Sequence, residues 1–295
     1  MNISFIIPVL NEEKTIGLCI ESIRTEMVAG DEIIVVDNGS TDDTPNIVKE
    51  NKNVIMLVYP GVSVGSLRNR GASIAKNELV AFIDADCMLC EGWRNTVDKV
   101  FSDRNFDATG SSCIISDEAT WVERAWRPVR SSKDRTTQFI ASANFIVRRS
   151  VFEKIGGFNE KLITDEDTDI CNRIHQAGSR MINTSGTKVV HLGNPKKIID
   201  FIKSEKWHAT SFYDTLSVRK INRPAIATFC FLFSILLSIF LFVFQLKNDF
   251  TIFYSVLAAG LIGFVPVASA IHRVLKNKDL RTFGGLVVLF FFYYS

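Results

Sequence analysis

The stretch Leu79-Val80-Ala81-Phe82-Ile83-Asp84-Ala85-Asp86 joins an unbroken apolar run to two aspartates. Five consecutive apolar residues predict a short strand that is buried on both faces of a sheet. Side chains two residues apart in extended backbone point to the same side, so Asp84 and Asp86 can be directed at one point beyond the strand. Ligands of open α/β sheets bind at that edge, and converging carboxylates suit Mg²⁺ or Mn²⁺ with a diphosphate. An acidic turn after a strand would show the same pattern, so the surrounding residues carry the argument.

The residues before this stretch alternate between apolar runs and helical patterns. Strands are predicted over Ile3–Val9, Glu32–Val36 and Val54–Val58. The helices between them are expected to begin near Asn11, at Pro45 and at Gly65. Such alternation is typical of βαβ units with right-handed crossovers, so the predicted fold class is α/β with a mostly parallel sheet and flanking helices. The loops after Pro8, Val36 and Ile83 then gather at one edge, and each carries acidic or amide side chains.

The second half of the mixed-composition region is less regular and ends in an acidic run. Strands are expected over Phe106–Ser111 and Phe139–Val147. The run Thr164-Asp165-Glu166-Asp167-Thr168-Asp169 begins a helix that ends at Gly178. Thr164 followed three residues later by an acid resembles a capping box, and acids favour a helix N-terminus. A cap does not require four carboxylates in five residues, however, so we expect a general base in this cluster.

The chain beyond Pro224 is almost entirely apolar. Ala225–Phe244 and Thr251–Ile271 each reach the roughly 20 residues that cross a bilayer, and Phe283–Tyr294 is about half as long. Basic residues flank the two longer runs on the side away from their connecting loop: Arg219, Lys220, Arg223, Arg273, Lys276, Lys278 and Arg281. The positive-inside bias therefore predicts two C-terminal transmembrane helices in the cytoplasmic (inner) membrane, with the N-terminal domain facing the cytoplasm. Whether the short third segment also enters the membrane is left open.

Several function classes are disfavoured. A net charge of +2 gives no argument for a nucleic-acid partner. No Gly-X-Gly-X-X-Gly follows a strand and no Gly-X4-Gly-Lys-Ser/Thr occurs, which argues against a dinucleotide oxidoreductase and a P-loop NTPase. Cys87 and Cys90 form a Cys-X-X-Cys pattern, but no second pair lies at zinc spacing. We interpret the six scattered cysteines as ordinary thiols.

Taken together in their order along the chain, these motifs resemble the family 2 inverting glycosyltransferases of the GT-A fold. The resemblance covers roughly Ile3 to His191. It rests on Phe5-Ile6-Ile7-Pro8-Val9-Leu10-Asn11-Glu12, Val36-Asp37-Asn38-Gly39-Ser40-Thr41-Asp42, Arg68-Asn69-Arg70-Gly71, Phe82-Ile83-Asp84-Ala85-Asp86, Gly156-Gly157-Phe158 and Glu166-Asp167-Thr168-Asp169 with Arg173.

The resemblance implies a role for each matched position. The donor-binding residues would be Pro8, Asn11, Glu12, Asp37, Arg68, Asp84 and Arg173, with Pro8, Asn11 and Glu12 lining the nucleotide pocket and Arg173 supporting the helix or the diphosphate. The metal, Mn²⁺ or Mg²⁺, would be held by Asp86, with His191 as a further metal or phosphate ligand. Asp167 would take the proton from the acceptor hydroxyl, and Glu166 or Asp169 are alternatives that the sequence leaves open.

The resemblance also implies a domain organisation. Residues 1–195 would form the GT-A catalytic domain, with a nucleotide-sugar half over 1–100 and an acceptor half over 101–195. Residues 196–223 are basic and amphipathic, a pattern that suits a membrane interface. Residues 224–295 would form the membrane region.

The expected reaction is transfer of a sugar from a nucleotide-sugar donor to a hydroxyl of a lipid-linked or cell-surface glycan. A divalent metal would stabilise the leaving diphosphate, and a carboxylate base would deprotonate the acceptor, which attacks once and inverts the anomeric carbon. Two alternatives stay open at this point. One is transfer to a polyprenyl phosphate, whose attacking oxygen is already ionised, and the other is a non-catalytic nucleotide-sugar-binding membrane scaffold.

Overall fold

The computed structural model describes residues 1–126, 134–209, 223–247, 251–277 and 280–294. Its contacts divide the chain into two compact units. The first consists of Met1–Ser116 and Val129–Asn194, and the second of Asp117–Pro128 and Pro195–Ser295. Asp117–Pro128 lies within the sequence predicted to be the acceptor half, yet it belongs to the second unit.

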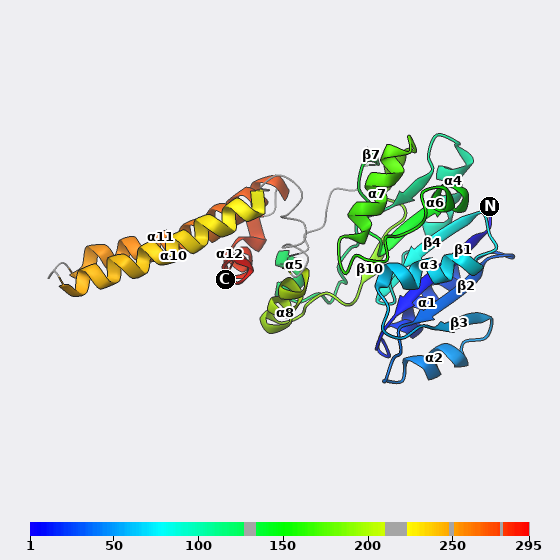
Figure 1. Cartoon of the computed structure of the whole chain (residues 1–295), viewed down its shortest axis with the longest axis horizontal. Coiled ribbons are helices and arrows are strands. Elements are labelled where there is room, and N and C mark those ends of the chain that lie inside the picture. The colour runs from blue at the N-terminus through cyan, green and yellow to red at the C-terminus, as the bar shows by residue number, and fades with distance from the viewer. Residues whose placement is uncertain (127–133, 210–222, 248–250, 278–279, 295) are drawn as a thin grey trace. The chain divides into compact units, whose positions relative to one another are not determined.

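The first unit is built on a twisted sheet with helices on both faces (Figure 1). In chain order its elements are β1 (Ile3–Val9), α1 (Ile16–Glu26), β2 (Glu32–Asp37), α2 (Thr44–Glu50), β3 (Val54–Val58), α3 (Val64–Ile74), β4 (Leu79–Ile83), β5 (Cys87–Leu89), α4 (Trp93–Ser102), β6 (Ala108–Gly110), β7 (Arg135–Thr137), β8 (Asn144–Arg148), α6 (Arg149–Lys154), α7 (Glu166–Gln176), β9 (Met181–Asn183) and β10 (Val189–His191).

The strand order among the described residues is β3-β2-β1-β4-β8-β6-β9-β7. The four N-terminal strands β3, β2, β1 and β4 are mutually parallel, as the alternation of strands and helices predicts. β8 runs antiparallel to both β4 and β6. A separate antiparallel ribbon of β5 and β10 places His191 opposite Cys87. The parallel α/β fold is therefore confirmed, with an antiparallel strand inserted beside β4.

β4 is buried on both faces, as its continuous apolar run predicts. Leu79, Ala81 and Ile83 belong to the core that α1 and α4 cover. Val80 and Phe82 belong to the opposite core, which α3, α6 and α7 cover. Every residue of β4 is 0% exposed, so its carboxyl end is fixed where Asp84 begins.

In the first unit, two expected boundaries differ from the structure by five residues, and the others by no more than two. The first helix begins at Ile16 rather than near Asn11, because Asn11 adopts a positive φ of 56° and the carbonyl of Glu12 accepts the amides of Thr15 and Ile16 in a turn. The strand expected over Phe139–Val147 begins only at Asn144. The residues before it turn, with the amide of Asn144 donating to the carbonyl of Ala141, and they face the candidate site described below.

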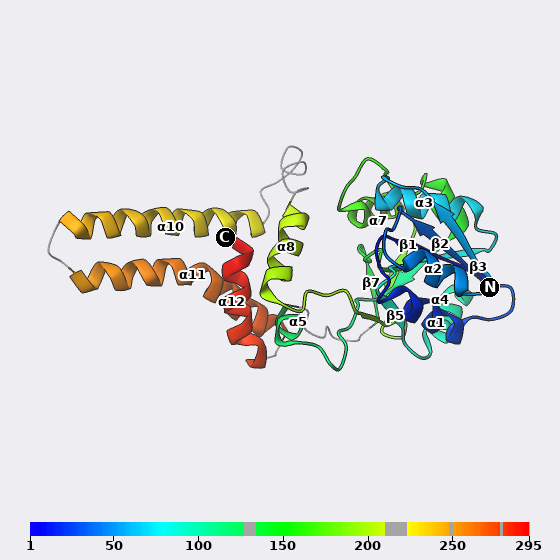
Figure 2. The same ribbon diagram turned by 90° about the horizontal axis from the view of Figure 1, so that it is seen from below.

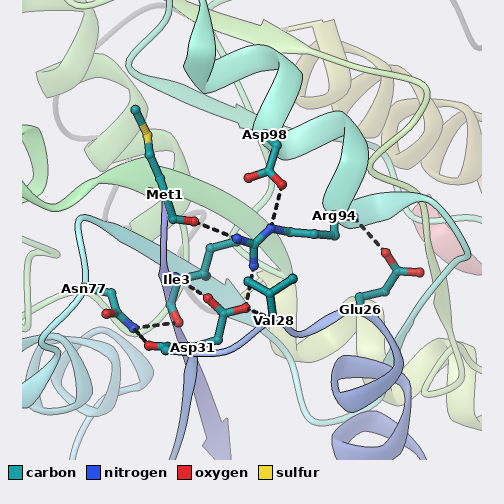
Figure 3. A network of polar contacts seen from close by, with 9 residues as sticks. Met1, Ile3, Glu26, Val28, Asp31, Asn77, Arg94 and Asp98 are labelled. Atoms are coloured by element: carbon teal, nitrogen blue, oxygen red, sulfur yellow. Dashed lines mark hydrogen bonds and ion pairs between the residues drawn. The ribbon is translucent and has the colours of Figure 1, made fainter.

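The amino ends of the strands are held by Arg94, as Figure 3 shows. Its guanidinium pairs with Asp31 and Asp98 and donates to the carbonyl of Met1 at 2.6 Å. Asp31 also accepts the amides of Ile3 and Val28 at 2.8 and 2.9 Å. This network ties the starts of β1 and β2 to α4, at the end of the sheet opposite Asp84.

The second unit is helical and contains α5 (Trp121–Trp126), α8 (Ile198–Ala209), α10 (Arg223–Lys247), α11 (Thr251–Asn277), the short 3-10 helix η1 (Leu280–Thr282) and α12 (Phe283–Tyr294). α10 and α11 lie side by side in Figures 1 and 2. Trp126 is at the centre of a cluster with Phe201, Phe290 and Arg273. α12, whose fate the sequence left open, packs its Leu286 and Leu289 into this core.

The expected membrane spans are not supported. Among the helices of the described residues, none is both long enough and apolar enough to cross a bilayer. The prediction rested on the length of the two apolar runs, which form α10 and α11. The expected interfacial segment over 196–223 is described only as far as Ala209, where α8 buries Phe201 against Trp126. The rest of that segment lies outside the described residues.

Candidate functional site

The loops after β1 and β2 are joined by direct hydrogen bonds. The amide of Asn11 donates to Oγ of Ser40 at 2.9 Å, and the amide of Thr41 donates to Oδ1 of Asn11 at 2.8 Å. Asp37, at the end of β2, is 2% exposed and accepts both the amide and the hydroxyl of Ser40. These loops form one ordered wall at the carboxyl edge of the sheet. Pro8 is buried within β1, in register with Val36.

Asp86 lies where the β4 loop meets the β5–β10 ribbon. Its Oδ2 is 3.5 Å from Nε2 of His191, and its backbone carbonyl accepts the amide of Leu192 at 2.8 Å. Burial raises the pKa of the Asp86 carboxyl to about 6. The neighbouring charges of Asp84 and Glu12 contribute to this rise, and His191 opposes it. Asp84, Asp86 and Glu12 therefore lie in one acidic environment.

The donor groups of Asp86, Cys87 and His191 lie within 4.8 Å of one another. Carboxylate oxygen and imidazole nitrogen suit a divalent metal such as Mn²⁺. Nδ1 of His191 is buried and has no hydrogen-bond partner among the described atoms, so the ring is not committed to another contact. Cys87 is less available, because a hydrogen bond with Cys113 and burial hold its pKa well above the usual value. Asp86 and His191 are thus the pair that fits a metal.

Arg68 connects this edge to the acidic helix. One terminal nitrogen of its guanidinium is 2.7 Å from Oδ1 of Asp84, and the other is 2.7 Å from Oε1 of Glu166. Arg68 is 2% exposed, and Oε1 of Glu166 also accepts the hydroxyl of Ser142 at 3.1 Å. The α7 cluster and the β4 loop therefore belong to the same site.

The carboxylates at the start of α7 have different partners. Glu166 is held by Arg68, and Asp169 is bound by two nitrogens of Arg173 at 2.9 and 2.6 Å. Asp167 accepts the amide of Thr168 at 2.7 Å, and no ion pair joins it to any described residue. Burial raises its pKa to about 6, and the charge of Glu166 adds to that effect. A carboxylate with a raised pKa and no ion pair can accept a proton near neutral pH.

Comparison with known proteins places the chain in a family. The profile described as "Glycosyl transferase family 2" matches residues 4–156, more than half of the chain. The chain belongs to glycosyl transferase family 2. A second profile, "Glycosyl transferase family group 2", matches residues 112–271. Curated relatives of this family include the pre-mycofactocin glycosyltransferase of Mycobacterium tuberculosis, which is 25% identical over 61% of this chain and 40% of its own length.

Another relative is the O-antigen chain rhamnosyltransferase WbaN of Salmonella anatum, which is 28% identical over 55% of this chain and 57% of its own length. The chain thus spans about half the length of these family 2 relatives. Solved structures share the fold. A mannosyltransferase from Pyrobaculum calidifontis, in complex with GDP-Man and Mn²⁺, superposes with a TM-score of 0.58 at 18% identity, over 97% of this chain and 85% of its own. GalNAc-T7, with UDP, GalNAc and Mn²⁺, superposes with a TM-score of 0.53 at 17% identity, over 70% of this chain and 48% of its own.

Within this family 2 chain, Arg173 pairs with Asp169 of its own helix. Besides Asp169, its guanidinium donates to the carbonyl of Ile155 at 2.8 Å. Arg68, which the resemblance placed among the donor-binding residues, is buried, and each of its terminal nitrogens pairs with one protein carboxylate, while its Nε is buried without a hydrogen-bond partner among the described residues. The polar contacts of both arginines among the described residues are with protein oxygens, and their part in donor binding stays a prediction.

Two residues of the site escaped the sequence analysis. Ser142 binds Glu166 through its hydroxyl, and Gly193 lies against Asp86, since a Cβ at Gly193 would be 1.9 Å from Oδ2 of that aspartate. Neither residue lies in a motif. Only the position of Gly193, two residues after His191, gave any signal.

Proposed function

We propose that this chain is a metal-dependent, inverting glycosyltransferase that moves a sugar from a nucleotide-sugar donor to an acceptor hydroxyl, with Asp167 as the general base. The observation that carries the proposal is the division of roles among the carboxylates at one sheet edge. Asp86 lies beside His191, while Glu166 and Asp84 both form ion pairs with Arg68, and Asp169 forms one with Arg173. Asp167 alone of the described α7 acids has no ion pair and has a raised pKa.

The chemistry follows from these positions. Asp86 and His191 would hold Mn²⁺ or Mg²⁺, which stabilises the negative charge that grows on the leaving diphosphate. The loops of Asn11 and Asp37 would hold the nucleoside. Asp167, ionised above its pKa of about 6, accepts the proton of the acceptor hydroxyl as that oxygen attacks the anomeric carbon. One displacement inverts that carbon and leaves no covalent sugar on the protein.

We further propose that the acceptor is a lipid-linked or cell-surface glycan and that the protein acts at the cytoplasmic face of the inner membrane. The apolar surface of α10 supports this proposal, because Phe229, Phe233, Leu236 and Phe240 are each more than 60% exposed. Exposed apolar patches of this kind mark lipid or protein contacts. Flotation of the full chain with vesicles of anionic phospholipid tests the location, and a protein that stays at the bottom of the gradient contradicts it.

The decisive experiment uses two steps. First, a thermal-shift screen of UDP-, GDP- and dTDP-sugars with and without Mn²⁺ identifies the donor without knowledge of the acceptor. Second, the full chain is incubated with that donor, Mn²⁺ and membrane lipid extract, and the product is analysed by chromatography and for anomeric configuration. We expect metal-dependent transfer that Asp86→Ala abolishes. Asp167→Asn decides between acceptors, because it would hardly affect transfer to a polyprenyl phosphate. Donor binding without any transfer or hydrolysis would leave the scaffold alternative, and absence of donor binding would contradict both.

A further inference from the structure

We propose that Arg68 is a positioning residue that holds the donor side and the base side of the site in register. It does so by binding Asp84, at the end of β4, and Glu166, the first residue of α7, with the two ends of one guanidinium. The inference rests on the proposed function, because it assigns α7 the base Asp167. It goes beyond that function by giving a role to a buried side chain that joins the two acids.

The guanidinium is fixed from several directions. Each terminal nitrogen is 2.7 Å from one carboxylate oxygen, and the group lies 5.3 Å from the centre of the Phe158 ring. Phe158 is in turn held by the neighbour of Arg68 in α3, because Asn69 accepts the amide of Phe158 at 2.8 Å and donates to its carbonyl at 2.9 Å. The planar fork of Arg68 therefore has one available orientation, which a lysine cannot reproduce at both carboxylates.

The two carboxylates belong to segments that the sheet alone does not hold together. Asp84 follows a strand, and the loop from Phe158 to Asp165 separates α7 from the elements before it. Asp84 has 31% of its side chain exposed and Glu166 has 11%, so Asp84 faces the accessible part of the site. A buried ion pair adds little stability relative to well-packed apolar residues, so stability alone is a weak reason for this arrangement.

Arg68 also acts on the base through charge. The groups that face Asp167 are Glu166 and Asp165 of its own chain segment, which raise its pKa, and Arg68 of α3, which lowers it. Cys171, one turn further along α7, is affected by Asp167 in return. Without Arg68, Asp167 would stand beside an uncompensated Glu166, so its protonated form would be favoured.

The test compares Arg68→Gln, Arg68→Lys and Glu166→Gln with the matched control Arg70→Gln. Arg70 lies two residues along the same helix, is exposed, and stacks on Tyr59. Two quantities are measured in the full chain: the affinity for UDP and GDP with Mn²⁺ by calorimetry, and the titration of the Asp167 carboxyl by carbon-13 NMR, assigned with Asp167→Asn. The pH profile of kcat follows where transfer is observed.

For Arg68→Gln we expect about tenfold weaker nucleotide binding, as for the loss of a residue that orients a ligand-binding carboxylate. We expect the Asp167 pKa and the acid limb of kcat to rise by about one pH unit. Arg68→Lys should keep the titration near wild type while nucleotide binding weakens, because the charge stays and the fork is lost. Glu166→Gln should lower the Asp167 pKa without affecting nucleotide binding.

Wild-type values of both quantities in Arg68→Gln, with only a lowered melting temperature, would overturn the proposal and leave a structural ion pair. If Arg68→Gln does not fold, the other two variants decide. The proposal is then overturned if Arg68→Lys binds nucleotide with wild-type affinity and the pKa of Asp167 in Glu166→Gln equals that of the wild type. A wild-type chain that binds no nucleotide and transfers no sugar defeats the proposed function instead, and the NMR titration still decides whether Arg68 controls Asp167.

Discussion

Nε2 of His191 lies 3.5 Å from Oδ2 of Asp86, although 104 residues separate the two in the chain. The β5–β10 ribbon brings them together by pairing His191 with Cys87. The contact joins the end of the sheet to the last strand of the first unit. It also makes the predicted metal site a property of the folded unit rather than of the Asp84-Ala85-Asp86 motif.

Asp86→Asn and His191→Ala are expected to abolish the part of nucleotide binding that depends on Mn²⁺, because each removes one of the two side chains proposed to hold the metal. The measurement is the melting temperature with UDP or GDP, with and without Mn²⁺, followed by removal of the metal with EDTA. Asp103→Asn is the control, since Asp103 is an acid on the loop after α4 that bonds Asn105. Metal-dependent stabilisation that survives in His191→Ala would limit the ligand set to Asp86.

Asp167→Asn is expected to reduce kcat by about 10²- to 10⁴-fold with a hydroxyl acceptor, the usual contribution of a general base. In the wild type, kcat should fall as the pH drops through about 6, because protonated Asp167 cannot accept the acceptor proton. Asp165→Asn is the matched control. It keeps a residue type that tolerates the positive φ of 63° at this position, and it removes a charge that raises the Asp167 pKa. In Asp165→Asn the fall of kcat at acid pH should therefore occur at lower pH than in the wild type. A fall at the same or a higher pH would contradict the assignment of Asp167 as the base.

The same raised pKa predicts a cost in stability. The folded chain binds the Asp167 proton more tightly than the unfolded chain does, so this group destabilises the fold progressively as the pH rises from about 4 to above 6. Asp167→Asn should therefore raise the melting temperature at pH 7.5 and have little effect at pH 4. Equal melting temperatures of the two proteins at pH 7.5 would show that Asp167 is not disfavoured in its ionised form.

The parts of this molecule that sequence could predict are those that depend on neighbouring residues. The run from Leu79 to Ile83 predicts a strand buried on both faces, and the alternation around it predicts the parallel half of the sheet. The acids after β4 and at the start of α7 were predicted to be site residues for the same local reason, and the structure joins them through Arg68. Arg68 lay within a motif, but its two partners lie 16 and 98 residues away, and only the fold shows that it joins them.

Other features could not be predicted because they depend on packing between distant segments. Nothing near Trp126 indicates that Asp117–Pro128 leaves the first unit to pack with α12. The apolar runs of α10 and α11 predicted membrane spans from length and composition, and the described helices do not support that prediction. Gly193 illustrates the same limit. A glycine is needed there because a Cβ would collide with the side chain of Asp86, which lies more than one hundred residues away in the chain.

Arg94→Met is expected to lower the free energy of unfolding by about 3 to 5 kcal/mol, because it leaves the carboxylate of Asp31, whose side chain is 0% exposed, buried without its ion pair. Urea unfolding followed by circular dichroism measures the change. Arg104→Ala, an exposed arginine just beyond α4, should alter stability by no more than about 0.5 kcal/mol. Nucleotide binding should persist in folded Arg94→Met, since the network lies at the opposite end of the sheet. A change as small as that of the control would show that Asp31 finds sufficient compensation in the amides of Ile3 and Val28.

Gly193→Ala is expected to weaken Mn²⁺-dependent nucleotide binding by about tenfold or more while the chain still folds. The new Cβ would lie 1.9 Å from Oδ2 of Asp86, the oxygen that faces His191, so the carboxylate must rotate or move away. Gly17→Ala is the matched control, because its Cβ would meet only Ile47 at an ordinary 3.6 Å, and alanine favours the helix there. Calorimetric titration of both variants with UDP or GDP and Mn²⁺ separates the two effects. If Gly193→Ala binds metal and nucleotide as well as Gly17→Ala does, the carboxylate of Asp86 has a second position from which it can act, and its contact with His191 is not required.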